Sequence, residues 1–146
     1  MQEIKRIVIP VDRSDASKLA TEQGAHLAKL LGVDVVVLSI DDSQQFMASV
    51  ILEEKIRKEN ETIIEEFKKI AEAREATVHT QIIKGTNPAD EIVKFTNEED
   101  LIVMASRNRK GLDKFVLGSV SEEVLRCALC PVMVIKPHLS KENHNL

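Results

Sequence analysis

The sequence predicts an α/β fold built on a parallel sheet, and two observations lead to this prediction. Five short apolar runs alternate along the 146-residue chain with four segments of helical periodicity. This β-α-β-α-β-α-β-α-β order is typical of a parallel sheet with right-handed crossovers and helices on both faces. Most of the runs lack regular polar alternation, as expected for strands that are covered on both faces. We expect one domain over residues 1–137 and a polar tail over residues 138–146.

The first strand and helix are predicted close to the N-terminus. Residues 4–11 form an apolar, β-branched run, and Pro10, which cannot donate a ladder hydrogen bond, should mark its end. Ser14 or Asp15 is expected to cap the following helix, because a short polar side chain there accepts a hydrogen bond from a free N–H group. Gly32 is expected to close that helix.

A second buried strand is predicted over residues 33–40, followed by a long charged helix over about residues 50–73. Asn60 interrupts the apolar stripe that this helix is expected to turn toward the sheet. The stripe consists of Leu52, Ile56, Ile63, Phe67 and Ile70.

Three further strands are predicted over residues 77–84, 101–105 and 131–135. A helix is expected between the first two, because Asn87 followed by Pro88 is a strong helix-start signal.

Composition and charge exclude several classes of function. The chain has four Phe but no Trp or Tyr, a net charge of -4 and no long basic block, which argues against a nucleic-acid partner. No apolar run is long enough to span a bilayer, and the N-terminal run is broken by Pro10 and followed by Asp12, unlike a signal peptide. We therefore expect a cytoplasmic protein with no membrane partner.

Cys127 and Cys130 form a C-x-x-C pair. A redox pair of this kind normally lies at a helix N-terminus, where the first thiolate is stabilised. Here the pair follows the helical pattern of residues 120–126 and falls at a helix C-terminus, where the helix dipole disfavours a thiolate. This position favours the interpretation that the cysteines are simply two small apolar residues at a helix–strand junction. We also predict no metal site.

Ligands of parallel α/β proteins bind beyond the C-terminal ends of the strands, so the loops there are the candidates for function. Asp12, after the first strand, has a carboxylate suited to a ribose hydroxyl or a hydrated cation. Alternatively, Asp12 and Ser14 only organise the turn and cap the helix. At the end of the second strand, the backbone near Ile40 offers hydrogen bonds to a planar base.

The third such loop covers residues 105–121 and combines basic side chains with Gly118 and Ser119 at a helix start. Free N–H groups, the helix dipole and a hydroxyl would converge there, as an anion site requires. The alternative is a solvated loop before a helix capped by Ser119, which has capping-box spacing with Glu122. The P-loop, the G-x-G-x-x-G fingerprint and the G-x-S-x-G elbow are all absent from the sequence.

The chain resembles the universal stress protein family from Ile4 to Pro137. The matching segments are IVIPVDRS, VVVLSID, GTNPADEIV and DLIVMASRNRKGLDKFVLGSVSEEVLRCALCPVMVIK. The resemblance implies a doubly wound five-stranded sheet of order 3-2-1-4-5, of the adenine nucleotide alpha hydrolase-like type. It also implies a homodimer formed through the last strand by Val132, Val134 and Ile135.

Nucleotide-binding members of this family carry G-x-x-G, nine residues, then G-[ST]. The matched positions here are Ala105, Asn108, Gly118 and Ser119, so the second half of the motif is intact and the first half is not. Asn is the best replacement for a glycine at positive φ, whereas Ala105 adds a methyl group where a ligand would approach the backbone.

The resemblance implies an adenine nucleotide as ligand, with Mg²⁺ as a candidate companion. The implied site residues are Pro10, Val11, Asp12, Ile40, Met104, Ala105, Arg107, Asn108, Gly118, Ser119, Val120 and Ser121. The resulting hypothesis is a dimeric ATP- or AMP-binding module that reports stress or energy state. The alternatives are a nucleotide-free dimeric interaction protein and a slow Mg²⁺-dependent ATPase, the latter disfavoured because the chain offers no clear general base at a γ-phosphate.

Overall fold

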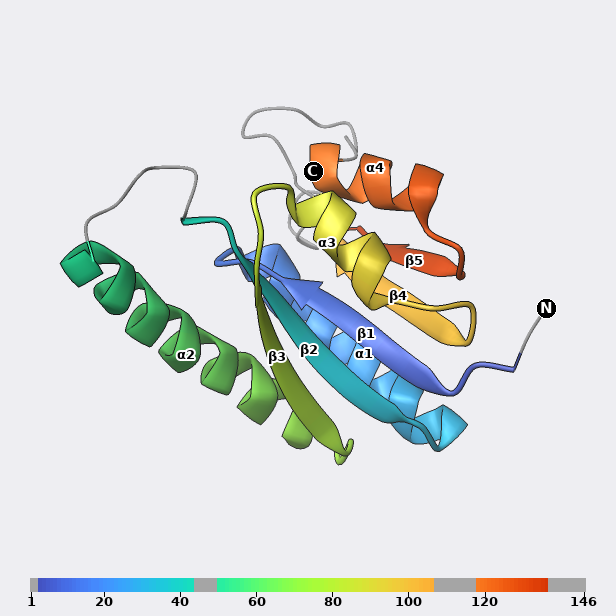
Figure 1. The fold of residues 1–146 in the computed structure, drawn as a ribbon. Helices are drawn as coiled ribbons and strands as arrows, with labels where there is room; N and C mark the ends of the chain where they lie inside the picture. Colours follow the sequence, from blue (N-terminus) through green and yellow to red (C-terminus); the bar gives the residue numbers. More distant parts are fainter. Residues whose placement is uncertain (1–2, 44–49, 107–117, 137–146) are drawn as a thin grey trace, which may run out of the picture.

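The computed structural model describes residues 3–43, 50–106 and 118–136, which form a parallel five-stranded sheet with helices against both faces (Figure 1). The elements are β1 (Arg6–Val11), α1 (Asp15–Leu31), β2 (Asp34–Asp41), α2 (Val50–Glu72), β3 (Val78–Lys84), α3 (Pro88–Phe95), β4 (Asp100–Ala105), α4 (Ser119–Cys127) and β5 (Val132–Ile135). The strand order is β3-β2-β1-β4-β5, which confirms the predicted fold class. None of the helices in these ranges has the length and apolar character needed to cross a membrane.

The central strand, β1, pairs with β2 on one side and with β4 on the other. Val8, for example, lies opposite Val36 of β2 and Ile102 of β4. Along the chain, β2 and β3 are added on one side of β1, and β4 and β5 are then added on its other side. The direction of strand addition therefore reverses between β1 and β4. The loops that leave β1 and β4 therefore diverge, which opens a crevice at the C-terminal ends of these strands.

Two apolar clusters fill the space between the sheet and its helices, one on each face. Successive strand residues point to opposite faces. Ile7 and Ile9 therefore belong to the cluster under α1 and α2, whereas Val8 belongs to the cluster under α3 and α4. Gly24 allows α1 to approach the sheet closely, because a Cβ atom there would lie 2.6 Å from Cδ1 of Ile9.

The predicted ends of α1 and the predicted start of α3 are confirmed. The Ser14 side chain accepts a hydrogen bond from the N–H of Ser17, and Gly32 closes α1 in the left-handed conformation at φ 70°. Asn87 Oδ1 accepts from the N–H of Asp90, 3.1 Å away, at the start of α3.

The apolar stripe predicted for α2 is wrong in its first half. Ile64, Phe67 and Ala71 are the buried residues of this helix, whereas Leu52 is 45% exposed. The N-terminal part of α2 projects beyond the edge of the sheet, so its apolar side chains have no sheet to cover (Figure 1). Only the C-terminal half packs on β2 and β3.

At the opposite end of the sheet, where the strands begin, an ion pair between Arg6 and the buried Asp100 joins two strands. Asp100 is 1% exposed. Its carboxylate accepts hydrogen bonds from Nε and Nη2 of Arg6 at 2.9 and 2.8 Å and from the N–H of Asn97 at 2.9 Å. The Arg6 guanidinium also lies over the Phe95 ring, 4.9 Å from its centroid. These contacts join the starts of β1 and β4 to the end of α3.

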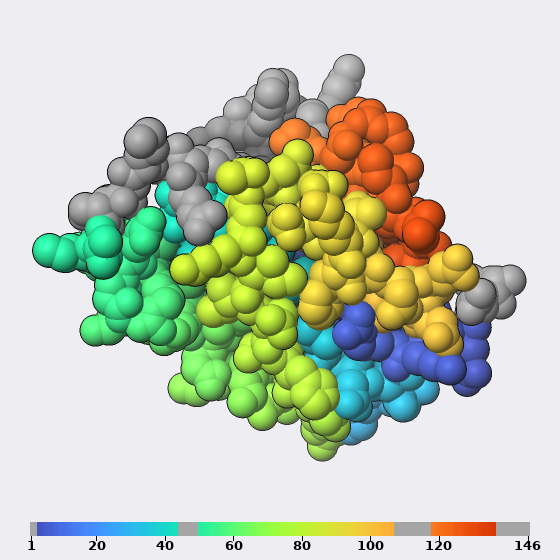
Figure 2. All heavy atoms as spheres, viewed as in Figure 1, coloured from blue at the N-terminus to red at the C-terminus, as the bar shows by residue number. Residues whose placement is uncertain are grey.

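The two edge strands differ from the buried centre. In β3, His79, Thr80 and Gln81 are exposed, and the space-filling view shows the residues of β3 at the surface beside α3 (Figure 2). At the other edge, the side chains of β5 are half-buried or exposed, with Met133 42% exposed.

Candidate functional site

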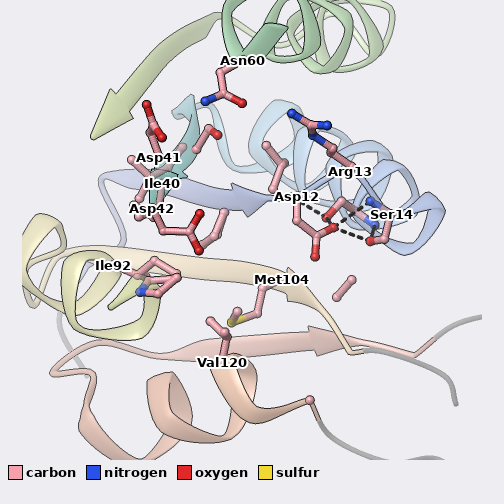
Figure 3. A pocket seen from close by; sticks show the side chains of 18 of the residues that line it. Asp12, Arg13, Ser14, Ile40, Asp41, Asp42, Asn60, Ile92, Met104 and Val120 are labelled. Atoms are coloured by element: carbon pink, nitrogen blue, oxygen red, sulfur yellow. Dashed lines mark hydrogen bonds between the residues drawn. The ribbon is translucent and has the colours of Figure 1, made fainter. Parts of the chain in front are cut away.

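A pocket of about 580 Å³ opens where β1, β2 and β4 end, between α2 on one side and α3 and α4 on the other (Figure 3). Every predicted site residue in the described part of the chain lines it. These residues are Pro10, Val11, Asp12, Ile40, Met104, Ala105, Gly118, Ser119, Val120 and Ser121. The other two, Arg107 and Asn108, lie outside the described residues. The pocket lies at the switch point in strand order, as expected for a doubly wound sheet.

Asp12 is held in place by the turn between β1 and α1. Its Oδ1 accepts hydrogen bonds from the N–H of Ser14 at 2.8 Å, from Oγ of Ser17 at 2.9 Å, and from Oγ of Ser14. Asp12 thus organises the turn, as the structural alternative predicted. It also lies exposed on the pocket wall, so the same bonds orient a carboxylate toward any ligand in the pocket.

The backbone of Ile40 faces the pocket because β1 ends before β2 does. The pairing of β1 with β2 stops at Val11 and Ser39. Along β2, the N–H of Val35 and the carbonyl of Asp41 bond to the β3 side. Backbone groups of successive strand residues alternate in direction, so those of Ile40 point toward β1. Because β1 has already ended, the Ile40 carbonyl faces the pocket.

Apolar side chains form two facing walls of the pocket. Ile40 lies on one side, and Ile92, Met104 and Val120 lie opposite (Figure 3). Met104 is only 5% exposed. Such a slot suits a flat apolar ring whose edge can reach the backbone at the end of β2.

The first turn of α4 differs from the prediction. The helix is capped by Gly118, with no side-chain hydrogen bond, and Ser119 is its first helical residue, so the predicted capping box is wrong. The reason is that helical geometry begins one residue earlier than the capping box requires, at Ser119, with a glycine at the N-cap. Helix geometry leaves the first N–H groups of α4 without intrahelical partners. A helix N-terminus without a side-chain cap thus opens into the pocket and favours an anion.

Two other hydroxyl groups lie close to this turn. Ser121 Oγ donates a 3.0 Å hydrogen bond to the carbonyl of Ala105, which ties α4 to the end of β4. The backbone N–H is therefore the only donor that Ser121 has left for a ligand. Ser106 is fully buried, and its Oγ has no hydrogen-bond partner among the described residues.

Ala105 ends β4 and lies on the pocket wall. Among the described non-glycine residues, only Glu75 has a positive φ, so Ala105 adopts a backbone that any residue tolerates. A glycine is therefore not needed here for conformation. What alanine changes is the space in the pocket, by one methyl group.

Sequence reasoning missed the contribution of α2. Glu59 and Asn60 line the pocket, together with Arg13 from the turn after β1. Arg13 Nη2 lies 3.5 Å from Oε2 of Glu59, so this exposed ion pair connects the turn to α2 across the pocket rim. The sequence signal that could have indicated this contribution is Asn60, the polar residue that interrupts the apolar stripe of α2.

The cysteine pair lies at the far end of α4 from the pocket. Cys127 ends the helix, as predicted, and both thiols are free. Burial raises the pKa of the Cys130 thiol, and the negative charge of Asp100 adds to this effect. No group of three or more potential metal ligands occurs among the described residues.

The fold and the pocket define a doubly wound α/β protein with a pocket at its topological switch point. The chain belongs to the universal stress protein family, whose family model matches residues 3–136.

Related sequences and solved structures match this chain over nearly its whole length. Universal stress protein MJ0531 of Methanocaldococcus jannaschii is 35% identical over 140 residues, covering 90% of this chain and 82% of the relative. The solved structure of the hypothetical protein MJ0577, from the same organism, has a TM-score of 0.78 at 30% identity and covers 95% of this chain and 100% of its own. The universal stress protein of Archaeoglobus fulgidus in complex with dAMP has a TM-score of 0.70 at 26% identity, with coverage of 93% and 100%.

Proposed function

We propose that this chain binds an adenine nucleotide, ATP or AMP, in the pocket and acts as a dimeric regulator of stress or energy state. The observation that carries the proposal is the N-terminus of α4, which has no side-chain cap and opens into the same pocket as Asp12 and the Ile40 backbone. A nucleotide needs an anion site, a polar partner for ribose and a slot for the base. The related Archaeoglobus fulgidus protein is in complex with dAMP.

The base would occupy the slot between Ile40 and Met104, with Pro10 and Val11 closing its inner end. The Ile40 carbonyl is a fixed hydrogen-bond acceptor on the pocket side of β2. It suits the 6-amino group of adenine, whereas guanine would present its O6 acceptor to the same oxygen. This polarity favours adenine over guanine.

The ribose and phosphates would extend from Asp12 toward α4. The Asp12 carboxylate is oriented to accept from a ribose hydroxyl, and the N–H groups of Ser119, Val120 and Ser121 would bind phosphate. The backbone of Met104 and Ala105 and the side chains of Arg107 and Asn108 complete the proposed contacts. Mg²⁺ would accompany a bound triphosphate through phosphate oxygens and water.

The Ala105 methyl group is the main obstacle to this function. Because its backbone conformation is unstrained, Ala105 acts only through volume, and a ligand shift of less than a methyl radius would accommodate it. We expect wild-type protein to bind ATP. Ala105→Gly should strengthen that binding by about tenfold or less, equivalent to about 1.4 kcal/mol or less.

Calorimetric titration of purified protein with ATP, AMP and GTP tests the proposal. Adenine nucleotides should bind more tightly than GTP, and Ser119→Pro should weaken binding, because proline at the first helical position keeps the helix but removes one N–H group. Ser119→Ala removes the hydroxyl but keeps that N–H, so it is the matched control, and the loss of affinity beyond that of Ser119→Ala measures the N–H. The absence of binding at millimolar ATP would contradict the proposal. Binding that appears only after Ala105→Gly and Asn108→Gly would identify a nucleotide-free interaction protein.

A further inference from the structure

Asn60 is the residue of α2 that the fold does not explain. It stands among apolar positions on the inward side of the helix, yet it is half-buried in the pocket rather than packed on the sheet. Its carboxamide makes no hydrogen bond with another residue in the described part of the chain. A polar group that is partly removed from water without a protein partner costs stability unless something else binds it.

The position of Asn60 places it beside the proposed base slot. It projects from α2 toward the pocket on the same side as Asp41, beyond the end of β2 (Figure 3). Ile40 lies on that strand, and α2 packs against β2. A base held with its amino group at the Ile40 carbonyl would therefore present an edge toward α2.

The chemistry of a carboxamide matches that edge. Adenine presents a donor, its 6-amino group, next to an acceptor, a ring nitrogen, and a carboxamide offers an acceptor and a donor in one plane. Asn60 is the only carboxamide among the described residues that line the pocket.

The neighbouring acidic side chains cannot replace Asn60 in this role. A carboxylate group only accepts hydrogen bonds, so the carboxylates of Asp41 and Asp42 cannot donate to a ring nitrogen. Asp41 is 5% exposed, and its Oδ1 already accepts from the N–H of Ser43 at 3.0 Å. Asp41 therefore organises the turn after β2.

We propose that Asn60 determines base specificity by pairing its carboxamide with the 6-amino group and the adjacent ring nitrogen of adenine. This inference rests on the proposed nucleotide-binding function and names the side chain that reads the base. Asn60 and the Ile40 carbonyl together select a 6-amino purine. With N7 as that ring nitrogen, a 6-oxo purine would place an acceptor against the Ile40 carbonyl and present two acceptors, O6 and N7, to Asn60, so that one of the two Asn60 bonds is lost in either orientation of the carboxamide.

AMP and IMP provide the test, because they carry the same ribose and phosphate and differ at the 6-position and the protonation of N1. We expect wild-type protein to bind AMP at least about tenfold more tightly than IMP. Asn60→Leu keeps a side chain of similar size without the hydrogen bonds. It should reduce the ratio of AMP to IMP affinity by about tenfold through weaker AMP binding.

Asn60→Asp replaces the donor with an acceptor and should also reduce that ratio. Thr62→Asp is the control for added charge, since Thr62 lies on the exposed side of α2 and outside the pocket lining, and it should leave the ratio unchanged. Thermal unfolding of each variant checks that the fold is intact.

The possible outcomes separate this inference from the function on which it rests. Wild-type protein that binds neither nucleotide would overturn both. Wild-type protein that prefers AMP, with the same preference in Asn60→Leu and Asn60→Asp, would overturn the role of Asn60 alone and leave the Ile40 carbonyl as the selecting group.

Discussion

Replacing Asp100 by asparagine should destabilise the protein although the side chain keeps its shape. Asp100 accepts three hydrogen bonds from Arg6 and Asn97, and it is 1% exposed. An asparagine side chain has one acceptor oxygen and one amino group. In either orientation, its amino group would face an N–H donor that the carboxylate now satisfies.

The magnitude follows from the burial of the pair. Removing one partner of a buried ion pair costs about 3–5 kcal/mol. The Arg6 side chain is 31% exposed and can recover part of its hydration, so the expected loss in the free energy of unfolding is lower, about 2–3 kcal/mol. For a chain of this length, that corresponds to a decrease in Tm of roughly 6–10 °C.

The assay is urea unfolding followed by circular dichroism at fixed protein concentration, with thermal unfolding beside it. Glu99→Gln is the matched control, because Glu99 pairs with Lys5 at 2.8 Å between the same two segments. Both of these side chains are well exposed to solvent, so the control should scarcely change the midpoint. An Asp100→Asn protein that unfolds at the same midpoint as Glu99→Gln would refute the argument from burial.

Two further predictions concern β5 and the cysteines. The carbonyls of Pro131 and Ile135 bond to the β4 side, so Val132 and Val134 turn their backbone groups outward along the proposed dimer edge. Val134→Pro removes an outward N–H and should convert the dimer to monomer in sedimentation at micromolar concentration, whereas Val134→Ala should not. A dimer that persists in Val134→Pro would exclude pairing through this strand. Because burial raises the pKa of Cys130, its thiol should remain protonated at a pH where an ordinary thiol has begun to ionise. Alkylation followed by mass spectrometry should therefore modify exposed Cys127 before Cys130 at pH 8, and equal rates would contradict this expectation.

The sequence alone determined the fold class and most of the element boundaries. Uninterrupted apolar runs, Ser14, Gly32 and Asn87 are local signals, and each acts within a few residues of its own position. The family motif also indicated which loops to examine. The residues it marked within the described chain all line one pocket.

Only the tertiary structure decided what each polar group in that pocket contacts. Nothing local shows that Ser121 bonds to Ala105, that Gly118 rather than Ser119 caps α4, or that β1 ends before β2. The contribution of α2 is of the same kind, since Asn60 and Ile40 line the same pocket only because α2 packs against β2. Local patterns specify which elements form. Contacts between distant segments depend on where those elements end relative to one another, and no short stretch of sequence encodes that.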